Sequence, residues 1–383
     1  MNKRNNVLGI MLGAMILQTP SSSGSALPSP SPNKTRLLNY LEANYGKHII
    51  AGQMDCSWSD DPAMNMVRRV FDDTGKYPAL QGFDFLNFRY PGWGGGGSKQ
   101  TDEAIAWWQN GPIAGTHGIV AFCWHWRMPR TGLVRGNDDN FYTNSGDHKT
   151  NGTAFRIPYK NGALDKASGE WALIQEDLDL VAAELAKLKA LDIPVLWRPL
   201  HEAVGNWGKF PGGDAWFWWG ASGPEPYKAL YEYMYDYFTK EKQLNNLIWV
   251  WNGQDAAWFP KEEAVELVGN DLYPPAHDYG SQIAKFRETE AMVPTRNQGG
   301  KQPGSKQPLV ALTENGVIPD PDNLVKDGAK WSFFMTWNDS APAGTNGSNF
   351  WSGEHHNETA HKQKVYNHPY VITLDKLPDL TKD

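Results

Sequence analysis

Eight short apolar segments constrain the fold of this 383-residue chain more than any other feature of its sequence. Each segment is rich in branched or aromatic apolar residues, and most are separated from the next by a stretch with helical periodicity. Apolar strands that alternate with helices are typical of a parallel sheet buried on both faces. Eight such units predict an α/β fold of the (β/α)8 (TIM) barrel type. The expected strands are 48–54, 77–86, 118–126, a segment that begins at 193, 247–253, 265–273, 308–316 and 331–339.

The clearest helix is expected at 170–191, where five apolar residues recur at helical spacing. That spacing indicates core packing rather than a cofactor site. Further helices are expected at 35–44, 61–72, 102–110 and 225–242.

The segment that begins at Ile193 carries the strongest functional signal. Its apolar run changes abruptly to Arg198, His201 and Glu202, and the glycine-rich loop behind it contains the aromatic run WFWWG at 216–220. Barrel enzymes place their chemistry where the strands end. The structural alternative is a satisfied ion pair between Arg198 and Glu202. The four aromatic residues in a loop that also holds glycines cannot all be core, which favours a site.

Polar and aromatic residues recur at the other expected strand ends, which converge on one face of a barrel. Glycoside hydrolysis needs two carboxyl groups, one protonated and one ionised, and two of these residues are glutamates. Other catalytic patterns fit less well, because the H-E at 201–202 lacks the second histidine of H-E-x-x-H and no G-x-S-x-G or Walker loop occurs. The residues are Asp84, His125, Glu202, Asp271, Tyr273, Glu314 and Trp337.

The composition narrows the classes of ligand. The formal net charge is −7, and removal of Lys3 and Arg4 with a leader would make it −9. No basic run is dense enough to indicate nucleic acid. The 18 tryptophans stand mostly in glycine-rich contexts. Indole faces stack on the C–H faces of sugars as they pack on other flat partners, so a carbohydrate ligand is expected.

The first 26 residues have the pattern of a secretory signal, with Lys3 and Arg4, an apolar run at 7–17 and small residues up to Ala26. The apolar run is too short to span a bilayer, and no later segment is long enough. Residues 27–32 read as a Pro/Ser spacer, and 33–383 as a single catalytic domain. We therefore expect a secreted protein that is not held in a membrane.

Four further features leave alternatives open. A formal G-x-G-x-x-G at 92–97 lacks the context of a nucleotide site and reads as a flexible loop. The long polar loop at 127–168 could wall a cleft. Cys56 and Cys123 could form one bridge or stay as free buried thiols. His355, His356, Glu358 and His361 invite a metal hypothesis but lack a strong ligand spacing.

The motifs RPLHE (198–202), WFWWG (216–220) and TENG (313–316) together resemble glycoside hydrolase family 26, the mannanases among the barrel retaining hydrolases. The resemblance covers nearly the whole chain after the leader. It is specific, because most of the clan has Asn before the glutamate of the fourth strand, whereas this family has His, as at His201.

The resemblance implies a role for each residue of the site. Glu202 would be the acid/base and Glu314 the nucleophile, with Arg198 supporting Glu314. His201 would touch the sugar or orient the nucleophile. His125 and Trp126 form an H-W motif expected to contact the sugar on the side of the cleavage point away from the leaving group. Asp271 and Tyr273 form a D-x-Y motif that is also expected at the site. The remaining expected sugar contacts are Trp216 and Trp337. One departure is the segment 206–215 between the H-E-x-x-G and WFWWG motifs, which puts the role of Trp216 in question.

The expected function is therefore that of a secreted, retaining endo-β-1,4-mannanase. Its partners would be β-mannan polysaccharides or manno-oligosaccharides, and no resident metal or cofactor is expected. We expect it to be a monomer. Relatives that act on mixed-linkage β-glucan or β-1,3-xylan offer an alternative substrate, and a non-catalytic carbohydrate-binding barrel is the alternative from another class.

Overall fold

The computed structural model describes residues 27–132, 140–209, 214–293, 308–342 and 349–382. The expected secretory signal lies outside the described residues. Within them, no helix combines the length and the apolar character that crossing a bilayer requires.

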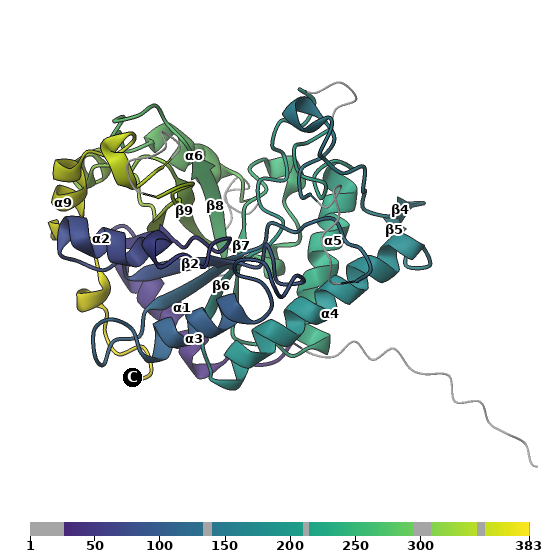
Figure 1. Cartoon of the computed structure of the whole chain (residues 1–383), viewed down its shortest axis with the longest axis horizontal. Coiled ribbons are helices and arrows are strands. Elements are labelled where there is room, and N and C mark those ends of the chain that lie inside the picture. Colours follow the sequence, from purple (N-terminus) through teal and green to yellow (C-terminus); the bar gives the residue numbers. More distant parts are fainter. Residues whose placement is uncertain (1–26, 133–139, 210–213, 294–307, 343–348, 383) are drawn as a thin grey trace, which may run out of the picture.

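The core of the structure is a closed barrel of eight parallel strands (Figure 1). Each strand pairs with the next along the chain, and β10 pairs with β1 to close the cylinder. The expected (β/α)8 fold is confirmed. The strands are β1 (Ile49–Met54), β2 (Leu80–Asp84), β3 (Ile119–Cys123), β6 (Val195–Arg198), β7 (Leu247–Trp251), β8 (Leu267–Leu272), β9 (Leu309–Asn315) and β10 (Phe333–Thr336).

The strands are buried almost throughout because their inner faces fill the barrel and their outer faces meet the helices. Along the axis, side chains such as Met54 and Met335 leave a cavity of only about 20 Å³. The barrel is therefore a packed core rather than a pore, and any site must lie on its rim.

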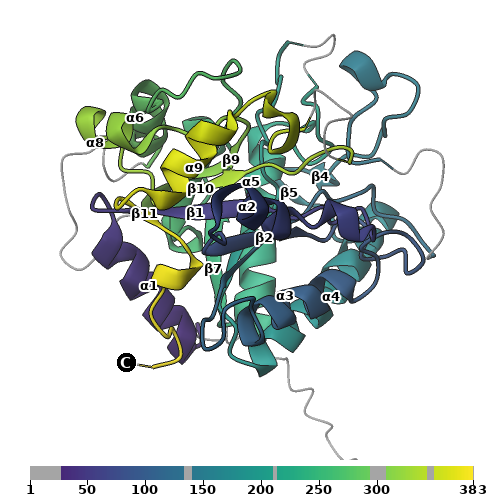
Figure 2. The same cartoon turned by 60° about the vertical axis from the view of Figure 1, so that its left-hand side comes forward.

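Helices surround the barrel in both views (Figures 1 and 2). Side-chain caps set several of their starts: Ser31 accepts from the backbone N–H of Lys34, and Ser168 from that of Trp171. The helices are α1 (Pro32–Asn44), α2 (Met66–Thr74), α3 (Lys99–Gln109), α4 (Gly169–Ala190), α5 (Pro224–Asp236), α6 (Ile283–Ala291), α8 (Pro321–Asp327) and α9 (Thr359–Asn367). Single 3₁₀ turns lie at Pro62–Met64, Gly146–His148, Ala256–Trp258, Glu262–Ala264, Ser352–Glu354 and Leu374–Lys376.

Three expected elements differ from the structure. The helix expected at 61–72 is split at Asn65, because the Asn65 side chain caps the N–H of Arg68 and starts α2 there. The helix expected at 225–242 leaves α-geometry after Asp236 and continues as a π-helical turn, Tyr237–Glu241. The long polar loop holds a small hairpin, β4 (Tyr159–Lys160) and β5 (Ala163–Leu164), beside α5.

The expected spacer also contributes to the fold at its end. Ser31 donates its backbone N–H to Asn245, and α1 begins at Pro32. A short ninth strand, β11 (Val371–Ile372), adds to the start of β1, and the next residues bond the segment that leads into β2. The early part of the sheet is thus held by a segment from the late part of the chain.

Candidate active site

A cavity of about 220 Å³ opens where the strands end. Six of the ten residues expected at the site line it, and Arg198, His201, Asp271 and Trp126 do not. The lining residues are His125, Tyr142, Glu202, Trp216, Phe217, Tyr273, Glu314 and Trp337.

Glu314 lies on β9 with its side chain 5% exposed. Both of its carboxyl oxygens accept a hydrogen bond: the Arg198 guanidinium donates to Oε1, and the Tyr273 hydroxyl donates to Oε2 at 2.6 Å. Donors aimed at both oxygens stabilise the ionised form and fix the orientation of the carboxylate. This arrangement suits a group that must act as a carboxylate.

Arg198 is held in place from behind the cavity by Asp271. Its Nη1 donates to Asp271 Oδ2 at 2.9 Å, while Asn252 and Thr313 donate to Oδ1 at 2.7 and 2.6 Å. The Asp271 side chain has no exposed area. The structure therefore does not support the expected sugar contact for Asp271 and gives it a bracing role instead, because its carboxylate is fully occupied by protein donors.

Glu202 projects into the cavity from the loop after β6. Its backbone has a φ of +50°, a left-handed conformation that is uncommon outside glycine. The backbone N–H of Glu202 donates to the Asn252 carbonyl at 2.7 Å, which ties the loop to the end of β7. One carboxyl oxygen each of Glu202, Asp271 and Glu314 lies within 4.8 Å of the others. Three acids this close cannot all stay ionised at low cost.

The two glutamates have different electrostatic surroundings. Burial, together with the charges of Asp271 and Glu314, raises the pKa of Glu202 well above its usual range. Burial and Asp271 also raise the pKa of Glu314, to about 7, but Arg198 and the Tyr273 hydroxyl oppose this. The proton of the pair therefore belongs on Glu202. Environments that separate two carboxyl groups in this way assign one the role of acid and the other that of carboxylate.

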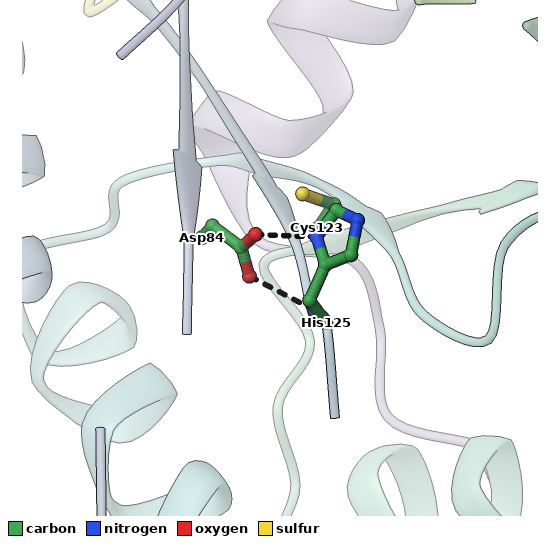
Figure 3. Close-up of side chains that lie close together, drawn as sticks. All are labelled: Asp84, Cys123 and His125. Atoms are coloured by element: carbon green, nitrogen blue, oxygen red, sulfur yellow. Dashed lines mark hydrogen bonds and ion pairs between the residues drawn. The ribbon is translucent and has the colours of Figure 1, made fainter. Parts of the chain in front are cut away.

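His125 is oriented by Asp84 at the end of β2 (Figure 3). Asp84 Oδ2 lies 2.5 Å from His125 Nδ1, and Oδ1 accepts the His125 backbone N–H at 2.9 Å. Burial opposes ionisation of Asp84, but His125 outweighs it and lowers the pKa of Asp84. An ionised carboxylate can only accept, so Nδ1 of His125 carries a proton and donates it to Asp84, while Nε2 lies beside His201.

His201 lies beneath the cavity with 1% of its surface exposed. Its Nε2 is 3.2 Å from His125 Nε2 and 4.0 Å from Glu314 Oε1. Burial and the nearby Arg198 lower the pKa of His201 well below its usual range, so the ring is neutral. Burial argues against contact of His201 with the sugar, and 4.0 Å from a neutral ring is too long for a hydrogen bond to Glu314, so its hydrogen-bond partner is His125.

Aromatic side chains form the rest of the wall. The indole of Trp216 packs directly on Gly205, where an added Cβ would lie 2.1 Å from Nε1. Tyr142 and Phe217 stack at 5.3 Å between ring centroids, and their backbones form a bridge. Neither residue was expected at the site. Phe217 stands in the WFWWG motif, and Tyr142 in the long loop expected to wall a cleft, but no spacing singled out either one.

Trp126, expected as a sugar contact, lies behind the wall of the cavity. It is fully buried, stacks on Trp124 and donates its indole N–H to Asp177 at 2.7 Å. It does not reach the cavity, and the structure gives no support to a sugar contact for it. Its indole instead packs against Trp218, so it supports the wall from behind.

The residues of the metal hypothesis do not converge in the described structure. His361 is buried at the start of α9, where Nε2 lies 2.8 Å from the Ile318 carbonyl and the ring stacks on Tyr279. Two other groups of donors do lie close together, Asp84–Cys123–His125 and the three acids of the cavity. Asp84 already bonds His125, and Asp271 and Glu314 bond Arg198, which fits a hydrogen-bonded site better than a metal site. Cys56 and Cys123 are free and buried.

A closed parallel barrel with two close, differently tuned carboxyl groups at its rim defines the class of barrel glycoside hydrolases. The chain belongs to glycosyl hydrolase family 26, whose sequence profile matches residues 27–376. The resemblance seen in the sequence motifs is thereby confirmed.

Several mannanases are similar to the chain. It is 33% identical to a mannan endo-1,4-β-mannosidase of Thermothelomyces thermophilus over 91% of this chain and 62% of that protein. It is 30% identical to mannan endo-1,4-β-mannosidase A of Piromyces sp., over 93% and 51%. The chain thus spans about half to three fifths of the length of these relatives. Among solved structures, a β-mannanase from a symbiotic protist of the termite Reticulitermes speratus, complexed with gluco-manno-oligosaccharide, matches with a TM-score of 0.72 and 31% identity over 94% of this chain and 98% of that one.

Proposed function

We propose that this protein is an endo-β-1,4-mannanase that hydrolyses mannan, glucomannan or galactomannan with retention of the anomeric configuration. The names of the relatives support the substrate class. The presence of both Glu202 and Glu314 in the cavity supports an enzyme over a non-catalytic sugar-binding barrel.

The observation that carries the mechanism is the spacing of the two carboxyl groups. Oxygens of Glu202 and Glu314 lie within 4.8 Å of each other. Retaining enzymes hold their carboxyl groups about 5–5.5 Å apart, whereas inverting enzymes separate them by about 6.5–9.5 Å to admit a water molecule. The short spacing is nearer to the retaining range and favours direct attack by a carboxylate.

In the first step Glu314 attacks the anomeric carbon, and protonated Glu202 donates its proton to the departing oxygen. Formation of the glycosyl ester removes the negative charge of Glu314. Because that charge helps to keep the pKa of Glu202 high, its loss lowers this pKa and leaves Glu202 as a carboxylate. Glu202 can then take a proton from a water molecule that attacks the anomeric carbon. This cleaves the ester, releases the sugar and restores protonated Glu202 and ionised Glu314.

The same proposal includes secretion, with residues 1–26 acting as a removable signal. The pattern of Lys3, Arg4 and the apolar run supports it. Amino-terminal sequencing of the protein recovered from the culture medium of its expression host would test it, with Leu27 expected as the first residue.

The activity is tested by reducing-sugar release from galactomannan, glucomannan, mixed-linkage β-glucan and β-1,3-xylan, measured side by side. Release of short oligosaccharides from the two mannans is expected. Release from the glucan or xylan alone would show that mannan is not the substrate, but both glutamates would keep their proposed roles. Binding without release on all four would contradict the enzyme assignment.

The nucleophile is tested by Glu314→Ala. We expect turnover to be lost and binding of the polysaccharide, measured by affinity electrophoresis, to be kept. Near wild-type turnover in this variant would remove Glu314 from its role. Retention is tested by NMR of the first product formed, which should be the β-anomer.

A further inference from the structure

Two exposed tryptophans stand outside the cavity on neighbouring loops. Trp58, 39% exposed, lies in the loop after β1, and Trp93, 51% exposed, lies in the loop after β2. Both loops leave the carboxyl ends of their strands, which is the face that carries the cavity. Large apolar side chains that share an exposed surface indicate an interaction site more often than isolated ones do.

The glycine run beside Trp93 explains how the two loops meet. A Cβ at Gly94 would lie 2.2 Å from the Trp58 carbonyl oxygen, and a Cβ at Gly95 would lie 1.7 Å from the Ser57 carbonyl oxygen. Gly95 also has a φ of +70°. Only glycine allows the two backbones to approach this closely. The run that resembles a G-x-G-x-x-G motif is thus a contact between loops.

Polar contacts hold the junction, that is, the contact between the loops of Trp58 and Trp93, in a fixed geometry. The backbone N–H of Gly95 donates to Asp60 Oδ1 at 3.2 Å, and Asp60 also pairs with Lys99. Asn87 Nδ2 donates to the Gly94 carbonyl at 2.8 Å. These contacts fix the backbones of the two loops, and a surface built on a preformed backbone loses less conformational entropy when a ligand binds.

The junction is tied to the cavity on the side of His125 and Trp337. Ser57, the neighbour of Trp58, accepts the backbone N–H of Asp84 at 2.9 Å, and Asp84 orients His125. On the other side, Asn338, the neighbour of Trp337, donates to the Asp55 carbonyl at 2.7 Å. The loop with Trp58 therefore starts between the parts of the rim that hold these two cavity residues.

We propose that Trp58 and Trp93 form a platform for sugar units of the polysaccharide that lie beyond the cavity, on the His125 side of the cleavage point. The ligand is a β-1,4-linked hexopyranose chain, whose rings expose C–H faces that stack on indoles. The inference rests on the proposed function, since it takes the chain in the cavity to be the chain that reaches the platform. A long substrate uses this surface, and a short one does not.

The test compares substrate lengths in the full chain. Trp58→Ala, Trp93→Ala and the double variant are assayed on mannotetraose and mannohexaose. Loss of two stacking surfaces should lower kcat/KM for the hexaose about tenfold and leave that for the tetraose within about twofold. Leu180→Ala on α4, which removes a side chain that is 37% exposed, is the control and should change neither.

An equal loss on both substrates, or no loss on either in variants with wild-type thermal unfolding, overturns the platform. If the wild-type protein cleaves no mannan, the proposed function fails, and affinity electrophoresis in galactomannan then judges the platform by itself. Weaker retardation of the double variant than of Leu180→Ala supports the platform. Equal retardation refutes it.

Discussion

The hydrogen bond from Tyr273 to Glu314 allows a sharp test of how the site is tuned. Tyr273→Phe removes only the hydroxyl that donates to Glu314 Oε2 at 2.6 Å. Tyr273 is 45% exposed as a residue, so the change is not expected to disturb the core. The bond favours the ionised form of Glu314. Without it the pKa of Glu314, already raised to about 7, rises further.

The expected size follows from the surroundings of the bond. A hydrogen bond to a charged group contributes about 1.5–3 kcal/mol. Arg198 still donates to the other carboxyl oxygen, and water can reach the exposed tyrosine position. The lower end of the range therefore applies, about 1.5 kcal/mol, or about a tenfold loss of kcat/KM. Because the nucleophile must be ionised, the acid limb of the pH profile of kcat/KM should move to higher pH.

The assay is the pH dependence of kcat/KM on manno-oligosaccharides for the wild type, Tyr273→Phe and a control. Tyr233→Phe is matched to it, since it deletes a hydroxyl that donates at 2.6 Å to Gln175 on the outer helices. The control should leave the profile unchanged. An acid limb that stays in place, or moves to lower pH, in Tyr273→Phe would refute the claim that this bond stabilises the Glu314 carboxylate.

Three further changes follow from the structure. Glu202→Gln should lower kcat on polysaccharide by about 10²–10⁴-fold because it removes general acid catalysis. On an aryl mannoside with a good leaving group, the glycosylation step should stay fast. Stopped-flow release of the aryl group checks this, and slow release would count against Glu202 as the acid. Gly205→Ala should displace the Trp216 indole, since the added Cβ would lie 2.1 Å from Nε1. Weaker substrate binding and altered tryptophan fluorescence are expected. An unchanged KM would argue against Trp216 as a sugar contact. Arg89→Met should destabilise the fold by about 3–5 kcal/mol, because it leaves the buried acid Asp177 without its cationic partner. Urea unfolding measures this cost, and a value below about 1 kcal/mol would contradict the prediction.

The fold was predictable because the signal is regular. Eight apolar segments that end in polar residues can be recognised without knowing which helix packs where. Element ends were less predictable, since they depend on single contacts. Asn65 caps α2 and so splits a helix that periodicity alone would continue. The π turn after Asp236 has no sequence signature in the tyrosine stripe around it.

The site shows a similar division. Strand-end position identified Glu202 and Glu314, because the barrel topology fixes where such residues meet. The sequence does not show how deeply each of these side chains lies within the rim. Asp271 and Trp126 stand beside true lining residues in the sequence, yet both side chains turn inward to protein partners. Tyr142 reaches the cavity through a backbone bridge to Phe217, a contact between distant segments that no local pattern encodes.

The short strand β11 has a consequence for how the chain folds. Val371 pairs with Ile49, and the Leu374 N–H bonds the Tyr77 carbonyl, so the start of the seam between β1 and β2 is completed by residues about three hundred positions later. During synthesis, the first two strands emerge long before this partner exists. Contacts of such sequence separation form slowly. Until the late segment has been synthesised, the incomplete barrel exposes apolar strand edges. The native state can therefore be reached only after translation of this late segment, and variants that weaken its pairing should lower the yield of folded protein more than they lower its activity.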